Sequence, residues 1–265
     1  MKPTLLIVLL LMTAAVFSQS RKLRTVSVTD PITQAFVDRT GDFYIQTRDG
    51  QIQKFDPDGN FINLYKGAVP PALFDPRDGA RLFAYFRGTQ QYAYLNPSFD
   101  VTALHSLDPA FAIAPWLICS SGDHNVWVLD TADWTIKKLN PKKEHLEAEG
   151  SLGFAPDKKP TDLILMREYQ GFLFVLDISA GIYVYNGIGK LIRTIPVKGL
   201  RTFNFLGEEL YYLSGKKLRF LDLFSAEERE MEIPAPASHI ILTDERIYAF
   251  QGLQISLYKL SSERN

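Results

Sequence analysis

One polar turn recurs along this chain at intervals of about forty residues. In each copy an aromatic residue or a leucine is followed by Asp or Asn, at Asp56, Asn96, Asn140, Asn186 and Asp222. The short side chains of Asp and Asn bond their own backbone and open a turn. These positions are separated by 40, 44, 46 and 36 residues. A period of this size is typical of a ring or a solenoid of repeated units.

The segments between these turns have the composition of strands. Six of them match one another as the second strand of each unit, at residues 42–46, 81–86, 125–129, 172–176, 209–213 and 246–250. They are rich in aromatic and β-branched residues, and none has the spacing of three and four that a helix needs. Each is followed by a Gly or Asp turn and a third strand. The sequence predicts an all-β, six-bladed β-propeller with four-stranded antiparallel blades.

The sixth unit stops early, because only residues 261–265 follow its third strand at 255–260. Residues 24–28 lie before the first unit and alternate polar with apolar side chains. We expect this N-terminal strand to complete the last blade and close the ring, since closure removes the open edges of a sheet.

The first eighteen residues have the anatomy of a secretory signal. Lys2 gives a positive start, residues 5–16 are mostly apolar, and Ser18 ends a stretch that suits signal peptidase. We expect cleavage before Gln19, so residues 1–18 form a signal peptide and 19–265 a single propeller domain, periplasmic or secreted. The alternative is an uncleaved anchor, but the segment is shorter than the roughly 20 apolar residues of a spanning helix. No other segment of the sequence is apolar over enough residues to predict a membrane-spanning helix.

Charge and cysteine content exclude some functions. The formal net charge is -1, from 29 basic and 30 acidic residues, which argues against nucleic acid as a partner. The single cysteine, Cys119, lies in an apolar first strand and cannot form an internal disulfide. Its expected role is core packing.

In blade period and turn pattern, residues 24–265 resemble the six-bladed propellers of the NHL-like and TolB-like kind, found among exported bacterial proteins. The third unit, residues 127–134, also resembles the blades of quinoprotein-type propellers, whose eight-bladed members include outer-membrane assembly scaffolds. Only one unit in six carries that second resemblance.

A propeller would line its central channel with the first strand of each blade, near residues 34–37, 72–74, 114–119, 162–165, 202–205 and 239–242. The loops that enter these strands share a face with the Gly turns, and in related propellers that face usually carries the site. The side chains expected there mix cations with aromatic rings, as interfaces do. They are Arg48, Arg87, Trp134, Lys158, Lys159, Arg201, Lys216 and His239.

A catalytic metal is the main alternative. Calcium-dependent, lactonase-like propellers need several oxygen ligands on one ion. Candidates are Asp162, Asn204 and Asp75, but they stand at different depths in their strands, and Glu is absent from every expected inner strand. The four histidines lack the i, i+4 spacing of a zinc-binding helix, and no Gly-x-Ser-x-Gly elbow is present. We therefore assign no catalytic, cofactor or metal residue.

Two functions remain open on these grounds. The favoured one is an exported, non-catalytic binding or scaffold module whose loop face takes a protein, peptide or glycan. The alternative is a calcium-dependent lactonase-like or esterase-like hydrolase with its site at the central channel.

Overall fold

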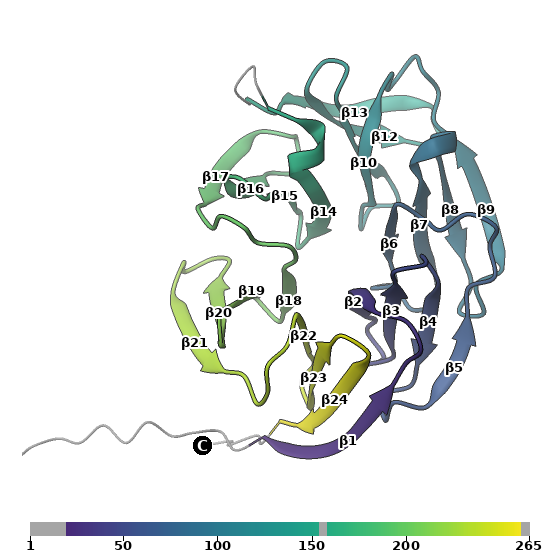
Figure 1. The fold of residues 1–265 in the computed structure, drawn as a ribbon. Coiled ribbons are helices and arrows are strands. Elements are labelled where there is room, and N and C mark those ends of the chain that lie inside the picture. The colour runs from purple at the N-terminus through teal and green to yellow at the C-terminus, as the bar shows by residue number, and fades with distance from the viewer. Residues whose placement is uncertain (1–19, 154–157, 261–265) are drawn as a thin grey trace, which may run out of the picture.

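The computed structural model describes residues 20–153 and 158–260. Within these residues, 24 strands form six separate four-stranded antiparallel sheets, and each sheet is one blade. Figure 1 looks into the ring, with β2, β6, β10, β14, β18 and β22 nearest its centre. The predicted six-bladed propeller is confirmed.

Each blade begins with an inner strand and moves outward along the chain. The strands, blade by blade from inside to outside, are β2 (Ile32–Val37), β3 (Phe43–Thr47), β4 (Ile52–Phe55), β5 (Phe61–Leu64); β6 (Leu73–Asp75), β7 (Leu82–Phe86), β8 (Gln91–Leu95), β9 (Val101–Ser106); β10 (Pro115–Ser120), β11 (Val126–Asp130), β12 (Thr135–Asn140), β13 (His145–Ser151); β14 (Leu163–Tyr169), β15 (Phe172–Asp177), β16 (Gly181–Tyr185), β17 (Leu191–Ile195); β18 (Asn204–Leu206), β19 (Glu209–Ser214), β20 (Lys217–Asp222), β21 (Glu228–Glu232); and β22 (His239–Leu242), β23 (Arg246–Gln251), β24 (Gln254–Lys259), β1 (Arg21–Ser27). Two 3₁₀ turns, η1 (Arg87–Thr89) and η2 (Pro160–Asp162), lie between strands.

The N-terminal strand closes the ring as the sequence predicted. β1 pairs antiparallel with β24, so that Val26 lies opposite Ile255 and Thr25 opposite Ser256. Figure 1 shows this purple strand running along the outer edge of the yellow last blade. Strands from the two ends of the chain therefore share one sheet, and neither β24 nor the ring is left open.

The recurrent Asp and Asn residues open turns by bonding backbone N–H groups ahead of them. The Oδ1 atom of Asp56 accepts from the amides of Asp58 and Asn60 at 2.9 and 2.7 Å. Asn96 accepts from the amides of Ser98 and Asp100, both at 2.9 Å. Equivalent bonds occur at Asn140, Asn186 and Asp222. One local interaction thus ends the third strand of five blades.

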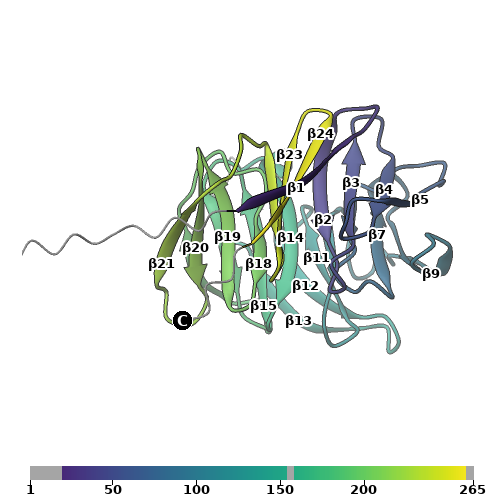
Figure 2. The ribbon, with the colours of Figure 1, turned by 90° about the horizontal axis from the view of Figure 1, so that it is seen from below.

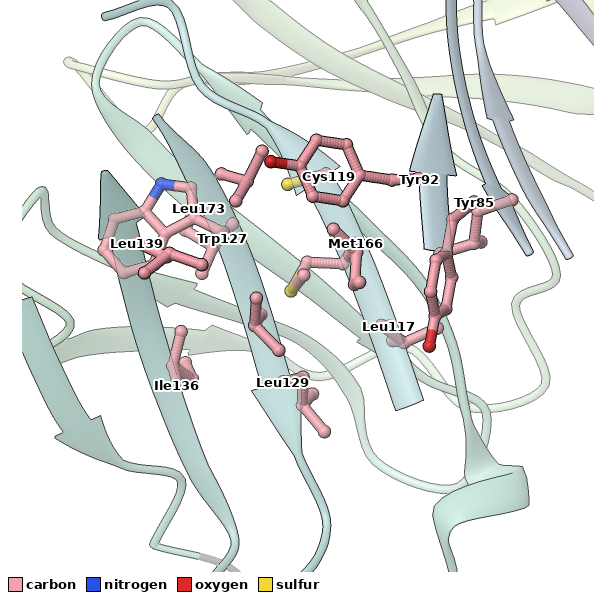
Figure 3. Close-up of a cluster of buried hydrophobic side chains, with 14 of the residues drawn as sticks. Tyr85, Tyr92, Leu117, Cys119, Trp127, Leu129, Ile136, Leu139, Met166 and Leu173 are labelled. Atoms are coloured by element: carbon pink, nitrogen blue, oxygen red, sulfur yellow. The ribbon is translucent and has the colours of Figure 1, made fainter. Parts of the chain in front are cut away.

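The core lies between neighbouring blades and is built mainly from aromatic and branched side chains. Figure 3 shows one such cluster, in which Trp127, Cys119 and Met166 from three different strands lie close together. Trp127 is completely buried, and Cys119 is 2% exposed, as its expected packing role requires. Each large side chain buried in this way contributes about 1.5–3 kcal/mol.

The ring has two faces, between which the strands run (Figure 2). We call the side where the inner strands begin the start face; it also carries the turns between second and third strands. The end face is where the inner strands finish, and the loops that follow them are residues 38–42, 76–81, 121–125, 170–171, 207–208 and 243–245. This face also carries the turns between third and fourth strands.

The predicted signal peptide, residues 1–18, lies outside the described residues. Within residues 20–153 and 158–260, no helix has the length and apolarity needed to cross a bilayer.

Candidate functional site

A cavity of about 1210 Å³ opens at the centre of the end face. All six blades contribute to it through the ends of their inner strands and the loops that follow. Its lining includes Asp38, Arg39, Asp75, Arg77, Arg81, Tyr94, Ser121, Gly122, His124, Arg167, Glu168, Tyr169, Asn204, Phe205, Gly207, Asp244 and Arg246. This convergence follows from the topology, because every inner strand ends at the same side of the ring.

An ion pair between Asp75 and Arg77 forms one part of the cavity floor. The Nε atom of Arg77 lies 2.9 and 2.8 Å from the two carboxylate oxygens of Asp75. Burial alone would raise the pKa of Asp75, but the Arg77 guanidinium outweighs it and holds that pKa below its ordinary value. Arg77 also donates to the backbone carbonyl of Glu168, which links the second blade to the fourth.

Arg167 forms the next part of the floor. It lies in β14 among apolar residues and is 5% exposed. Its Nη1 donates to the carbonyl of Phe203 at 2.9 Å and to the side-chain oxygen of Asn204. The guanidinium lies 5.8 Å from the Phe36 ring of the first blade. Burial, with the neighbouring charge of Arg77, lowers the pKa of Arg167 to about 10, although Asp75 opposes this.

Glu168 anchors the same inner strand to the third blade. Its carboxylate accepts from the Ser121 hydroxyl and from the Trp127 indole, both at 2.5 Å, and from the Gly122 amide at 3.0 Å. The Nζ atom of Lys138 lies 3.9 Å away. Two of these hydrogen bonds come from the loop 121–125 and hold it at the cavity wall, and the third comes from β11.

Aromatic rings form part of the wall. Tyr169 and Phe205 stack with centroids 4.1 Å apart and planes 4° from parallel. The Tyr169 hydroxyl donates to the carbonyl of Gly207 at 2.6 Å, which fixes the ring. Across the cavity, the Arg81 guanidinium lies 3.5 Å from the centre of the Tyr94 ring. The cavity therefore offers flat apolar surfaces beside charged groups, a combination suited to amphipathic ligands.

The three candidate metal ligands do not converge. Asp75 and Asn204 line the cavity, and each is bonded by an arginine. Asp162 lies in η2, before β14 begins, whereas Arg167 and Glu168 lie toward the other end of that strand. Among the described residues, no group of three or more His, Cys, Asp or Glu side chains is arranged to hold a metal ion.

Nucleophilic chemistry has little support in the cavity. The Ser121 hydroxyl donates to Glu168, and the Nδ1 atom of His124 lies 3.2 Å from the Nη1 atom of Arg81. A serine nucleophile is usually activated by a nearby base that a third group orients. In the described part of the chain, the hydrogen bonds of Ser121 and His124 form no such relay.

The eight residues predicted as a binding face lie around the start face, and none of them lines the end-face cavity. Arg48, Lys159, Arg201 and Lys216 are exposed in loops. His239, at the head of β22, is half-buried, and burial lowers its pKa. A shared binding role for these residues stays a prediction.

Three members of that predicted set have contacts of their own. The Nε atom of Arg87 donates to the carbonyl of Trp116 at 2.9 Å, and its guanidinium lies 3.7 Å from the centre of the Trp116 ring. Lys158 pairs with the buried carboxylate of Asp177. Trp134 is half-buried and has a positive φ of 56° in the turn after β11. For Arg87 and Lys158 these contacts stabilise the blades directly.

Arg77, Arg167 and Glu168 were not among the predicted site residues. Apart from the Arg77–Asp75 pair, their side-chain hydrogen bonds link residues 36 to 91 positions apart in the chain, so no local motif marks the cavity they form. One available signal was the pair Arg167 and Glu168 at the end of the otherwise apolar run that starts at Leu163.

Comparison with known proteins identifies the fold but no family. No protein-family model matches the chain, and no curated protein matches it by sequence. Among solved structures, it is similar to a catalytically inactive virginiamycin B lyase from Staphylococcus aureus with quinupristin, at 13% identity and a TM-score of 0.57, over 91% of this chain and 100% of that one. It is also similar to BamB from Moraxella catarrhalis, at 12% identity and a TM-score of 0.50, over 91% and 96%.

A third similar structure is the extracellular domain of BT4673 from B. thetaiotaomicron, at 13% identity and a TM-score of 0.53, where the match covers 88% of this chain and 34% of that one. At such low identity these likenesses show the fold alone. An enzyme and an extracellular domain are both among the matches, so the fold is compatible with either kind of role. The chain is a six-bladed β-propeller.

Proposed function

We propose that this chain is an exported, non-catalytic propeller whose end-face cavity binds a peptide, a protein segment or a glycan. The observation that carries the proposal is the cavity itself, with about 1210 Å³ of space at the convergence of six inner strands. Pockets for single small molecules usually measure about 300–1,000 Å³. The larger volume fits a short peptide or an oligosaccharide.

The chemistry of the wall supports recognition. Tyr169 and Phe205 offer a stacked aromatic surface, and the floor offers the guanidinium of Arg167. Aromatic and arginine side chains are the residues that most often dominate binding energy at interfaces. Because Ser121 and Glu168 bond each other and secure the loop, we assign them a structural role.

The hydrolase alternative needs a cation near Asp75 and Asn204. Arginines next to both groups oppose a calcium ion there, since like charges repel at short range. Elemental analysis of protein dialysed against calcium separates the two functions. About one retained ion per chain, together with ester hydrolysis that is lost in Asn204→Ala, would replace the binding proposal with the enzyme.

The direct test is a ligand screen with the purified chain from Gln19. Saturation-transfer NMR would be recorded with a defined panel of tripeptides to hexapeptides and of neutral and acidic oligosaccharides. We expect at least one class to bind with a Kd below about 1 mM and to remain chemically unchanged after a day. Turnover of a bound compound, or no binding across the whole panel, would contradict the proposal.

A further inference from the structure

The floor of the end-face cavity holds a buried cation that, among the described residues, has no carboxylate at ion-pair distance. Arg167 is 5% exposed and lines the cavity. Its bonded partners, the Phe203 carbonyl and the Asn204 side-chain oxygen, are both neutral. Among the described residues, Arg167 forms no ion pair and only its Nη1 atom makes a hydrogen bond. In the same part of the chain, every fully buried side-chain nitrogen or oxygen has a partner, so the free N–H groups of Arg167 face the cavity.

The nearby carboxylates already serve other groups. Asp75 is held through both of its oxygens by Arg77. The Glu168 carboxylate is held by Ser121, Gly122 and Trp127. Among the described residues, neither carboxylate forms an ion pair with Arg167 within 4 Å. Burial lowers the pKa of Arg167, the more distant charge of Asp75 raises it, and the charge of Arg77 lowers it further.

The cavity rim carries both signs of charge and does not neutralise the floor. Asp78, Asp244 and Glu245 are exposed, so solvent and salt screen them. Asp58 pairs with Arg246 at 2.7 Å. Asp38, which is buried, accepts hydrogen bonds from the Thr40 hydroxyl and from backbone amides. The single carboxylate of Asp75 therefore faces two guanidinium groups, those of Arg77 and Arg167, and one positive charge at the floor is left without a balancing group.

We propose that Arg167 binds a carboxylate group of the ligand through its free N–H groups. The inference rests on the proposed function and adds the chemical class of the ligand. A planar guanidinium matches a carboxylate in geometry and forms two parallel hydrogen bonds with it. One negative charge balances one guanidinium. A phosphate dianion would instead add a second negative charge beside Asp75 and Glu168.

Acetate is the simplest probe, and acetamide is its uncharged match in shape. Arginine side-chain Nε–H signals of ¹⁵N-labelled protein would be followed at constant ionic strength, with sodium chloride replaced by sodium acetate. We expect one Nε–H signal to shift saturably with acetate, with an affinity at least about tenfold higher than for acetamide. Melting temperature should rise with acetate and stay constant with acetamide, a comparison that needs only the wild-type chain.

Variants locate the effect. Arg167→Gln should abolish the shifting signal and the selectivity for acetate. Arg21→Gln removes one exposed positive charge from the outer strand β1 and should leave both unchanged. If Arg167→Gln does not fold, Arg167→Lys, which keeps the charge but has no planar fork, should reduce the preference for acetate over acetamide.

The outcomes separate this inference from the proposed function. An equal response to acetate and acetamide would overturn the carboxylate site, and so would a folded Arg167→Gln variant that still prefers acetate. If peptides or oligosaccharides of the screening panel still bind in that case, the proposed binding function stands without the carboxylate site. Inorganic phosphate that binds more than about tenfold tighter than acetate would also overturn the carboxylate site. N-acetylglycine and glucuronate distinguish the sources, because the tighter binder indicates a peptide C-terminus or an acidic sugar.

Discussion

The indole Nε1 of Trp127 donates a hydrogen bond to the carboxylate of Glu168 at 2.5 Å, and the two residues belong to neighbouring blades. Trp127 lies in the second strand of the third blade and is completely buried. Glu168 lies in the inner strand of the fourth. The bond fixes the angle between two blades beside the cavity, so the cavity shape depends on it.

Glu168→Ala should destabilise the fold by about 2–4 kcal/mol. The substitution leaves the Trp127 indole, the Ser121 hydroxyl and the Gly122 amide without their acceptor in a largely buried place. Urea denaturation followed by tryptophan fluorescence measures the change. Glu227→Ala, an exposed carboxylate in the loop before β21, is the control and should alter stability by less than about 0.5 kcal/mol. Equal effects of the two substitutions would contradict the anchoring role.

Asp130 should make the fold sensitive to acid. It is fully buried, and its carboxylate accepts from the Ile113, Ala114 and Ala132 amides and from Lys137, at 2.9–3.0 Å. Burial alone would raise the pKa of Asp130, but these hydrogen bonds hold it below the ordinary value of 3.8. The ionised form is therefore stabilised by folding. This contribution is complete above the unfolded pKa and is lost as pH falls through the lower folded pKa.

Asp130→Asn tests that dependence. The variant should be less stable than wild type by about 3 kcal/mol at pH 7, because Lys137 loses its buried partner. The difference should stay constant down to about pH 5 and shrink below about pH 4. Denaturation curves from pH 7 to pH 2 measure it. For Asp244→Asn, at an exposed carboxylate, the difference in stability from wild type should not change with pH. If the difference for Asp130→Asn stayed constant down to pH 2, Asp130 would not be the source of the acid sensitivity.

Removal of β1 should open the ring. A chain that starts at Thr29 leaves the edge of β24 unpaired, and Ile255 and Leu257 lose the cover of Val26. We expect a lower melting temperature and association at high concentration, because unpaired strand edges join one another. Light scattering and thermal unfolding detect both. A chain that starts at Gln19 keeps β1 and serves as the reference. Matching behaviour of the two chains would show that closure by β1 contributes little.

Export can be tested by determining which residue forms the N-terminus of the protein recovered from cells. The full sequence would be expressed in a bacterium with a secretory pathway, and the mature chain analysed by mass spectrometry. We expect cleavage after Ser18 and recovery of the chain outside the cytoplasm. Replacement of Leu9 and Leu10 with arginine should block both, because a signal needs a continuous apolar region. An intact, uncleaved chain in the cytoplasm would contradict export.

Local interactions explain why so much of the fold could be predicted from the sequence. Asp56 and Asn96 act on amides two and four residues ahead, so their recurrence alone reveals the repeat. The second strands begin within one residue of their predicted starts, because their own aromatic and β-branched residues mark them. β1 was harder to place because its partner lies at the far end of the chain. Alternation of polar and apolar side chains still located it to within three residues of its observed start.

The cavity could not be predicted in this way. Arg77 reaches a backbone carbonyl 91 residues away, and Arg167 reaches Asn204 across a blade boundary. Such contacts depend on how the inner strands are arranged around the ring, which a repeat pattern does not specify. The start face was predicted as the binding face because that face usually carries the site in related propellers. A test of which face binds the ligand needs one substitution on each face.

A matched pair of glycines provides the most direct test of where the ligand binds. Gly122 lies at the end-face cavity and Gly88 on the start face beside Arg87; both are exposed, and neither has a positive φ. A Cβ on Gly122 would come no closer than 3.6 Å to Glu168, and one on Gly88 would have open space. Both positions therefore accept a Cβ without backbone strain. The measurement is the Kd of the best ligand from the screen for wild type, Gly122→Trp and Gly88→Trp. We expect Gly122→Trp to weaken binding at least about tenfold and Gly88→Trp to leave it unchanged. Loss of binding in Gly88→Trp, with full binding in Gly122→Trp, would contradict the end-face site and support a site on the start face.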